Sequence, residues 1–297
     1  MKIINWLKVW FKAARAPFLI VSIVPGTLAG IMALKAGIWN GLHFALALVG
    51  AVLAHSAGDF FDDYYDFKSN TLGHKEQQFH DSPIIHGQVT ANQVLGAGIG
   101  CAVIALGIGA FFLFKVGMPI VYIAAATGLI AVFYTAPPIK LNFRGFGETG
   151  LFFAFGPLLT LGIWTAVTGQ LSLVAALIGI PIGLLTMNIG HISNTFDVPS
   201  DIAQNKTTIA VRLGQKNSVI LLAITSGLAY LAIGICVYFG LFPMWSLITL
   251  LTIPLAISVV VSTNKYSLPG NNYTAAMGQA IALTTVLSLL FIVAYLL

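Results

Sequence analysis

Nine apolar runs divide almost the whole chain, and they constrain its fold more than any other feature. The 297 residues are 58% hydrophobic and 8% charged, whereas a soluble protein carries roughly 25% charged residues. Each run is close to the roughly 20 residues that a helix needs to cross a bilayer. The sequence therefore predicts an all-α, polytopic membrane protein with nine transmembrane helices. The expected spans are residues 17–35, 39–61, 92–114, 118–135, 149–169, 172–193, 218–240, 244–262 and 272–297.

The charged residues are distributed unevenly among the connections between these runs. When the N-terminus is placed inside, only Lys35 and Lys115 of the 14 lysines and arginines fall on the outer side. Cytoplasmic connections of membrane proteins carry such an excess of basic residues. We therefore predict an integral membrane protein, in the inner membrane of a cell, whose N-terminus and charged loops face the cytoplasm. Its active site is expected at the same face.

The N-terminal segment, residues 1–16, is expected to form an interfacial helix. Lys8, Lys12 and Arg15 follow helical spacing, and Trp6 and Trp10 lie on another face. A basic amphipathic helix of this kind lies in the membrane surface, although a basic end that only sets the topology would explain the pattern equally well. No soluble domain separates the runs, so residues 1–297 are predicted to form a single transmembrane domain.

Two acidic motifs match each other at the ends of the second and sixth runs. They are Asp59-x-x-Asp62-x-x-x-Asp66 and Asn194-x-x-Asp197-x-x-x-Asp201. Six of only nine acidic residues lie in these motifs or beside them, at Asp63. Residues four apart on a helix point the same way, so each motif presents a pair of carboxylates. The repetition predicts two related four-helix halves plus a ninth helix, with a site where the halves face each other.

Facing carboxylates of this kind favour a divalent cation. All-oxygen ligands suit Mg²⁺, which takes one or two carboxylates and shares its other positions with water and substrate phosphates. Four basic residues lie in the inner loops after the fourth and sixth runs: Lys140, Arg144, Lys206 and Arg212. Carboxylates, a metal and cations together are typical of a site that holds a diphosphate. Alternatively, these acids are simply water-exposed residues at helix ends. That interpretation would explain a single motif, but it explains two matching motifs less well.

Three segments of the chain resemble the UbiA superfamily of intramembrane prenyltransferases. They are DDYYDFKSN (62–70), YTAPPIKLNFRGFGE (134–148) and NTFDVPSDIAQNKTTIAVRLG (194–214). The second segment and the NKTTIAVRLG end of the third are most similar to the branch that prenylates 1,4-dihydroxy-2-naphthoate in menaquinone synthesis. The resemblance implies a helical bundle around a central cavity, with Mg²⁺ between the acidic motifs. It implies transfer of a polyprenyl group from an allylic diphosphate to an aromatic acceptor.

The resemblance also implies roles for individual residues. The metal ligands would be Asp62, Asp66, Asp197 and Asp201, which with Lys140 form the expected catalytic set. The shell around the metal or diphosphate would comprise Asp59, Asp63, Lys68, Tyr134, Arg144, Asn194 and Lys206. The chain departs from the family pattern at Asp62, where Asn is usual, and at Asn70, where Asp is usual. It also has no arginine within 62–91. The expected partners are a polyprenyl diphosphate, the aromatic acceptor and the lipid bilayer, with no nucleic acid.

Two histidines precede the acidic motifs and leave two interpretations open. His191 lies three residues before Asn194, and His55 lies one turn before Asp59. Such a histidine polarises or deprotonates an acceptor hydroxyl, or else it packs between helices through a hydrogen bond.

Two other functions use the same features. A terpene cyclase on this scaffold needs no aromatic acceptor. An ion-coupled secondary transporter would bind its coupling ion at acids near the bilayer midplane, whereas the acids here lie at one end of the spans.

Overall fold

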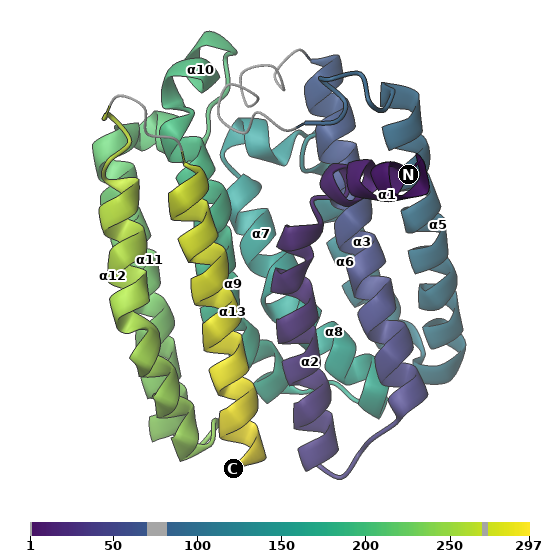
Figure 1. The fold of residues 1–297 in the computed structure, drawn as a ribbon. Coiled ribbons are helices and arrows are strands. Elements are labelled where there is room, and N and C mark those ends of the chain that lie inside the picture. Colours follow the sequence, from purple (N-terminus) through teal and green to yellow (C-terminus); the bar gives the residue numbers. More distant parts are fainter. Residues whose placement is uncertain (1, 70–81, 269–272) are drawn as a thin grey trace.

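The computed structural model describes residues 2–69, 82–268 and 273–297, and within these ranges it contains helices and connections but no strand (Figure 1). The α-helices are α1 (Lys2–Ala13), α2 (Ile20–Lys35), α3 (Gly41–Lys68), α5 (Ala91–Val116), α6 (Met118–Phe133), α7 (Gly147–Phe155), α8 (Pro157–Thr168), α9 (Leu173–Phe196), α10 (Val198–Ala203), α11 (Ile209–Tyr238), α12 (Ile253–Thr263) and α13 (Thr274–Leu296). Three 3₁₀ segments are η1 (Ala16–Leu19), η2 (Leu141–Arg144) and η3 (Met244–Thr252).

Polar caps and glycines set the boundaries of the long helices. Asn40 precedes α3, and its side chain accepts a hydrogen bond from the His43 backbone N–H at 3.0 Å. Thr90 and Gln93 form a reciprocal capping box that begins α5. Gly169, with a φ of 73°, ends α8 in the left-handed conformation that glycine adopts without strain. The helices therefore begin and end at local sequence signals.

Eight segments of the described chain are long and apolar enough to cross a membrane, and α6 is a ninth, shorter apolar helix. This confirms the predicted all-α polytopic fold. The second acidic motif differs from the expected single helix, because α9 ends before Asp197 and α10 follows. Pro199 favours the break at this point, because it has no N–H to donate to the turn before it. The Asp201 N–H still donates to the Asp197 carbonyl at 2.8 Å, so one turn of the helical spacing is kept.

The main hydrophobic core lies among α2, α9, α11, α12 and α13. Leu28 of α2, Ile182 of α9, Leu222 of α11 and Leu287 of α13 are fully buried within it. On the other side of α2 and α9, α3 packs chiefly against α5, and α8 contacts both α2 and α3 (Figure 1). The side formed by α9, α11, α12 and α13 with α2 is thus packed around a continuous core.

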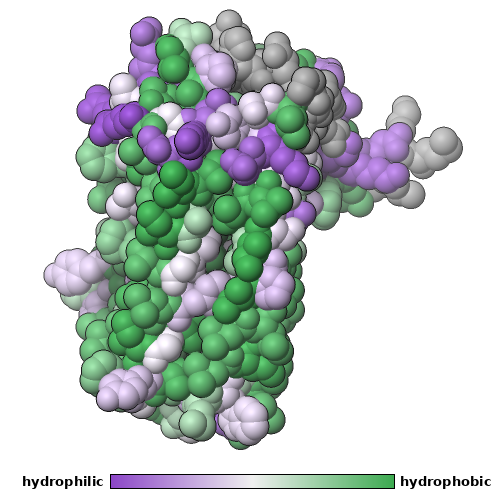
Figure 2. Space-filling model, turned by 90° about the vertical axis from the view of Figure 1, so that its left-hand side faces the viewer, coloured by the Kyte–Doolittle hydropathy of each residue, from purple (hydrophilic) through white to green (hydrophobic). Residues whose placement is uncertain are grey.

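The outer surface of the bundle is apolar over most of its height. Figure 2 shows the side that α11 and α12 form, where hydrophilic residues gather only toward the end that carries α10. Along α11, Ile220, Ile224, Leu228, Leu231 and Ile235 are exposed at helical spacing. Lipid tails are as apolar as these side chains, so exposure of this surface to lipid carries no penalty, whereas its exposure to water would be unfavourable. The chain is therefore an integral membrane protein.

α1 lies across the bundle at the end where α3 finishes (Figure 1). Its Trp10 packs edge-on against Phe60 of α3, with ring centroids 6.1 Å apart. Trp6, Leu7 and Phe11 remain exposed. One face of α1 is therefore docked on the bundle, while apolar side chains on its other faces stay available to lipid.

Candidate active site

A cavity of about 1290 Å³ opens between α2, α3, α5, α6, α7, α8 and α9. Small-molecule pockets usually measure roughly 300–1,000 Å³, so this cavity has room for a long ligand. Its inner walls are apolar and include Phe112, Ile120, Leu159 and Ile163. Among the described residues, none from α11 or α12 lines it. The structure thus contains the predicted cavity, lined chiefly by the helices from α2 to α9.

Polar residues gather at one end of this cavity, where α3 and α9 finish. We call this group the polar end; its residues are Arg15, Asp59, Asp62, Asp63, Asn194, Asp197 and Lys206. The first and second acidic motifs therefore flank the same space from two helices. A charged entrance above an apolar chamber suits a ligand with an anionic head and an apolar tail.

The twelve residues predicted for the site fall into two groups in the structure. Those that line the cavity are Asp59, Asp62, Asp63, Tyr134, Asn194, Asp197 and Lys206. Those that lie beside it are Asp66, Lys68, Lys140, Arg144 and Asp201. Asp66 is buried one turn beyond Asp62 on α3. The first motif thus has Asp59 and Asp62 at the cavity, the second has Asp197 there, and Asp66 and Asp201 are absent from the described cavity wall.

Arg15 forms ion pairs with the first acidic motif. Its guanidinium lies 3.1 Å from Asp62 Oδ2 and donates a hydrogen bond to Asp63 Oδ1. Burial alone would lower the pKa of Arg15, but the carboxylates of Asp63 and Asp62 raise it well above its usual value. The turn after α1 thus supplies a permanent cation to the polar end.

The second acidic motif has its own cation. Lys206 Nζ lies 3.1 Å from Asp201 Oδ1, and both side chains are buried. Asp197, which faces the cavity, accepts a hydrogen bond from Ser193 Oγ at 3.2 Å. Because Lys206 lines the cavity, its ammonium lies between Asp201 and the space where a ligand would sit.

The loops that follow α6 and α10 form one unit. Lys140 and Lys206 lie 5.0 and 4.8 Å from the centroid of the same Phe143 ring. The Thr207 N–H donates to the Phe143 carbonyl at 2.8 Å and joins the two loops. Each ammonium group therefore lies within the roughly 6 Å of the ring centroid at which a cation–π interaction is favourable. The shared ring keeps the two lysines in the same region.

Arg144 and Lys68 have other contacts. Arg144 Nη2 donates to the Pro138 carbonyl at 3.0 Å, within its own loop. Lys68 Nζ lies 5.9 Å from the Tyr64 ring centroid. Both cations belong to the surroundings of the polar end, outside the cavity wall.

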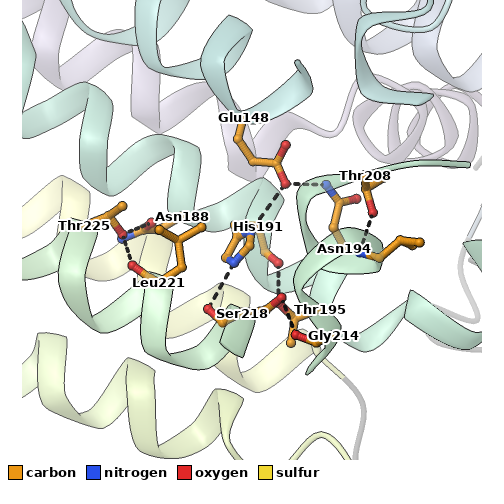
Figure 3. A network of polar contacts seen from close by, with 11 residues as sticks. Glu148, Asn188, His191, Asn194, Thr195, Thr208, Gly214, Ser218, Leu221 and Thr225 are labelled. Atoms are coloured by element: carbon orange, nitrogen blue, oxygen red, sulfur yellow. Dashed lines mark hydrogen bonds and ion pairs between the residues drawn. The ribbon is translucent and has the colours of Figure 1, made fainter. Parts of the chain in front are cut away.

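Behind the second motif, Glu148 of α7 connects three helices (Figure 3). Its Oε1 accepts hydrogen bonds from His191 Nδ1 at 3.2 Å and from Asn194 Nδ2 at 3.0 Å. His191 Nε2 lies 3.0 Å from the Ser218 carbonyl of α11. Asn194 also lines the cavity, so the buried carboxylate orients a residue of the polar end.

The two histidines have different surroundings. His191 is buried, absent from the described cavity wall, and engaged through both ring nitrogens. His55 lines the cavity; its Nδ1 is 2.9 Å from Ser22 Oγ and its Nε2 is 3.5 Å from Asp59 Oδ2. The helix-packing interpretation therefore holds for His191, while His55 is available to a ligand.

Arg15, Glu148 and Asn142 were not singled out from the sequence as site residues. Asn142 lines the cavity, and its backbone N–H donates to the Tyr134 carbonyl at 2.9 Å. The scarcity of acids is the signal that could have indicated Glu148, because it lies outside both motifs in an apolar chain. Arg15 has no comparable signal, since basic residues are abundant on the inner side.

The donor set at the polar end fits a magnesium ion that is shared with a phosphate. Within the described part of the chain, no three histidine, cysteine or acidic side chains form a ready cluster. Mg²⁺ needs fewer protein ligands, because it keeps several waters and uses one or two carboxylates plus substrate phosphates. Asp62 and Asp197 supply such carboxylates from opposite motifs at one cavity.

The UbiA prenyltransferase family matches residues 23–278. The chain belongs to this family. It is therefore a prenyltransferase enzyme, and the family resemblance noted in its motifs is confirmed.

Individual relatives agree with this assignment. The chain is 24% identical to the 1,4-dihydroxy-2-naphthoate octaprenyltransferase of Bacillus subtilis (strain 168), over 92% of this chain and 88% of that one. Its fold is similar to the apo structure of a UbiA homologue from Aeropyrum pernix K1, with a TM-score of 0.72, 15% identity, and 94% and 98% of the two chains covered. It is also similar to a UbiA homologue from Archaeoglobus fulgidus bound to GPP and Mg²⁺, with a TM-score of 0.64, 13% identity, and 97% and 98% covered.

Proposed function

We propose that this enzyme transfers a polyprenyl group from an allylic diphosphate to an aromatic acceptor in a Mg²⁺-dependent reaction. The observation that carries the proposal is the polar end, where two acidic motifs and basic side chains flank the entrance of a large apolar cavity. The diphosphate would bind at the polar end, and the polyprenyl tail would occupy the apolar walls. The solved Archaeoglobus relative supports the ligand class, because it is bound to GPP and Mg²⁺.

The metal and the diphosphate would share the residues of the polar end. Asp62, Asp66, Asp197 and Asp201 would hold Mg²⁺, which supplies Lewis-acid neutralisation of charge on the phosphate oxygens. Lys206 lines the cavity, and Lys140 is held beside it by Phe143. These ammonium groups would contact the diphosphate and stabilise the negative charge that develops on it as the allylic C–O bond breaks.

The apolar cavity would protect the allylic cation that this bond cleavage produces. Water within the cavity would capture the cation, so a chamber of aliphatic and aromatic side chains favours transfer over hydrolysis. Tyr134 and Phe155 line the cavity and present aromatic faces that can stabilise a cation.

We propose 1,4-dihydroxy-2-naphthoate or a related quinone precursor as the acceptor. The support is the similarity to the Bacillus octaprenyltransferase, which extends over most of both chains. The acceptor would approach the allylic carbon from the apolar side of the polar end.

We further propose that the polar end faces the cytoplasm, in the inner membrane of a cell. Only Lys35 and Lys115 among the basic residues lie on the other side in that orientation. α1 would then lie in the inner leaflet surface, with its exposed Trp6, Leu7 and Phe11 among the lipids.

Replacement of the acids tests this proposal. We expect Asp66→Ala and Asp197→Ala each to reduce kcat/KM for prenyl transfer at least 100-fold, by about 3 kcal/mol or more, because each removes a carboxylate from the proposed magnesium site. The measurement is transfer of radiolabelled geranylgeranyl diphosphate by purified protein over a range of Mg²⁺ concentrations. Lys216→Ala, a basic residue of α11 outside the cavity wall, is the control. Normal turnover in both acid variants would refute the site.

A further inference from the structure

One polar row lies within the cavity, apart from the proposed metal ligands. It consists of Ser22 on α2 and of His55 and Asp59 on α3, all three of which line the cavity. His55 Nδ1 is 2.9 Å from Ser22 Oγ, and His55 Nε2 is 3.5 Å from Asp59 Oδ2. The His55 ring also packs edge-on against Phe155, with centroids 4.6 Å apart. The row therefore offers hydrogen-bonding groups beside an aromatic wall.

The hydrogen bonds of this row determine where the ring proton lies. A carboxylate can only accept, so the nitrogen that faces Asp59, Nε2, carries the proton in the neutral ring. Nδ1 then accepts from the Ser22 hydroxyl, which fixes the tautomer and the ring orientation. This leaves an N–H donor and a carboxylate acceptor facing each other across 3.5 Å.

That separation is longer than a normal hydrogen bond, and Asp59 Oδ2 has no hydrogen-bond partner among the described residues. A hydroxyl oxygen that lies beside this gap, within hydrogen-bonding reach of both atoms, would satisfy both side chains. It would donate its proton to Asp59 and accept from the His55 N–H. His43, on the same helix, is partly buried and absent from the described cavity wall, and it instead donates to the Ala166 carbonyl through Nδ1 at 3.1 Å.

We propose that His55 and Asp59 bind and deprotonate a ring hydroxyl of the aromatic acceptor. This inference rests on the proposed function and extends it to the acceptor subsite. The hydroxyl proton passes to Asp59, and His55 Nε2–H stabilises the phenolate oxygen. The allylic C–O bond breaks and its electron pair leaves with the diphosphate, and electrons of the phenolate then form the new bond from a ring carbon to the allylic cation.

The ring then becomes aromatic again when the attacked carbon loses its substituent, either as a proton that the departed diphosphate accepts or as carbon dioxide. The carbonyl oxygen recovers the proton held by Asp59, so the pair returns to its starting state. Along α3, at 1.5 Å per residue, His55 lies about 10 Å and Asp59 about 4.5 Å before Asp62. A hydroxyl bound by this pair would therefore place the acceptor ring beside a diphosphate held by the other residues of the polar end.

The test uses acceptor analogues that lack one hydroxyl donor. Purified wild-type, His55→Leu and Asp59→Asn proteins are given geranylgeranyl diphosphate, Mg²⁺, and either 1,4-dihydroxy-2-naphthoate or each of its two mono-methyl ethers. His43→Leu is the matched control on the same helix. We expect the wild type to prefer the free dihydroxy acid over one ether by at least about tenfold in kcat/KM, because a site built for a hydroxyl donor rejects an analogue without it.

In both variants we expect this preference to fall below about threefold. In His55→Leu, which lies outside the polar end, the KM for geranylgeranyl diphosphate should stay within about threefold of wild type. The retained KM shows that His55→Leu is folded, measurable turnover shows the same for Asp59→Asn, and His43→Leu should keep the full preference. Wild-type discrimination in both His55→Leu and Asp59→Asn would overturn this inference alone. Absence of prenyl transfer by the wild type with every acceptor would instead overturn the proposed function, and the inference with it.

Discussion

At the scale of single residues, Arg15 is the side chain that most changes the electrostatics of the polar end. It lies between α1 and η1 with a φ of 46°, a left-handed conformation that non-glycine residues seldom adopt. This turn directs the chain from α1 into the bundle and brings the guanidinium to Asp62 and Asp63. The ion pairs are only partly shielded from solvent, because 31% of the Arg15 side chain remains exposed.

We expect Arg15→Ala to lower the Mg²⁺ concentration that gives half-maximal prenyl transfer. Arg15 and the metal compete for the Asp62 carboxylate, so removal of the fixed cation favours the metal. The expected decrease is about two- to fivefold, the effect of one partly exposed ion pair. It is measured by Mg²⁺ titration at saturating geranylgeranyl diphosphate. Lys8→Ala, which removes an exposed charge from α1, should change nothing, and an unchanged or higher requirement in Arg15→Ala would contradict the competition.

The residues of the acidic motifs could be predicted from sequence because helical spacing is a local property. Asp62 and Asp197 occupy the expected places at the ends of their helices, and both line one cavity. The contacts of Arg15 and Glu148 could not be predicted, because each depends on tertiary packing. Arg15 is 48 residues from Asp63 along the chain, and Glu148 is 43 residues from His191. Only the folded chain distinguishes these charges from others of the same type.

At the scale of helices, the junction between α7 and α8 shapes one wall of the cavity. The apolar run predicted as one span at 149–169 corresponds to one candidate span, Gly147–Thr168, which bends at Gly156, where φ is −108° and ψ is −106°. A Cβ at Gly179 of α9 would lie 2.4 Å from the Gly156 carbonyl carbon. Thr160 Oγ1 reinforces the contact by donating to the Ala175 carbonyl at 2.6 Å. The two backbones therefore approach as closely as small residues allow.

We expect Gly179→Ala to destabilise the folded protein by about 1–3 kcal/mol, because the added methyl group meets backbone atoms that cannot rotate away. The measurement is the apparent thermal unfolding midpoint in detergent. Gly234→Ala on α11 is the control, since its Cβ would meet nothing within 4 Å. Equal midpoints for the two variants would show that the close approach does not constrain the bundle.

At the scale of the whole molecule, the bundle has a packed side and a hollow side, and α2 and α9 contribute to both. α9, α11, α12 and α13 pack with α2 around a continuous core, whereas α3, α5 and α6 form walls of the cavity. The number and order of the membrane helices could be predicted from the apolar runs. The position of the cavity could not be predicted, because residues that face lipid and residues that face an apolar cavity are equally hydrophobic. The hydropathy of these helices therefore shows no helical periodicity that would distinguish the lipid-facing residues from the cavity-facing residues.

The central claim is that the acids and cations of the polar end ionise a polyprenyl diphosphate for transfer to an aromatic acceptor. The most direct test supplies purified wild-type protein with radiolabelled geranylgeranyl diphosphate and 1,4-dihydroxy-2-naphthoate, with either Mg²⁺ or EDTA. We predict labelled prenylated product with Mg²⁺ and none with EDTA. Diphosphate release with labelled product that forms equally well without any aromatic acceptor would contradict the claim and indicate a cyclase. An absence of diphosphate release with Mg²⁺ would contradict it altogether.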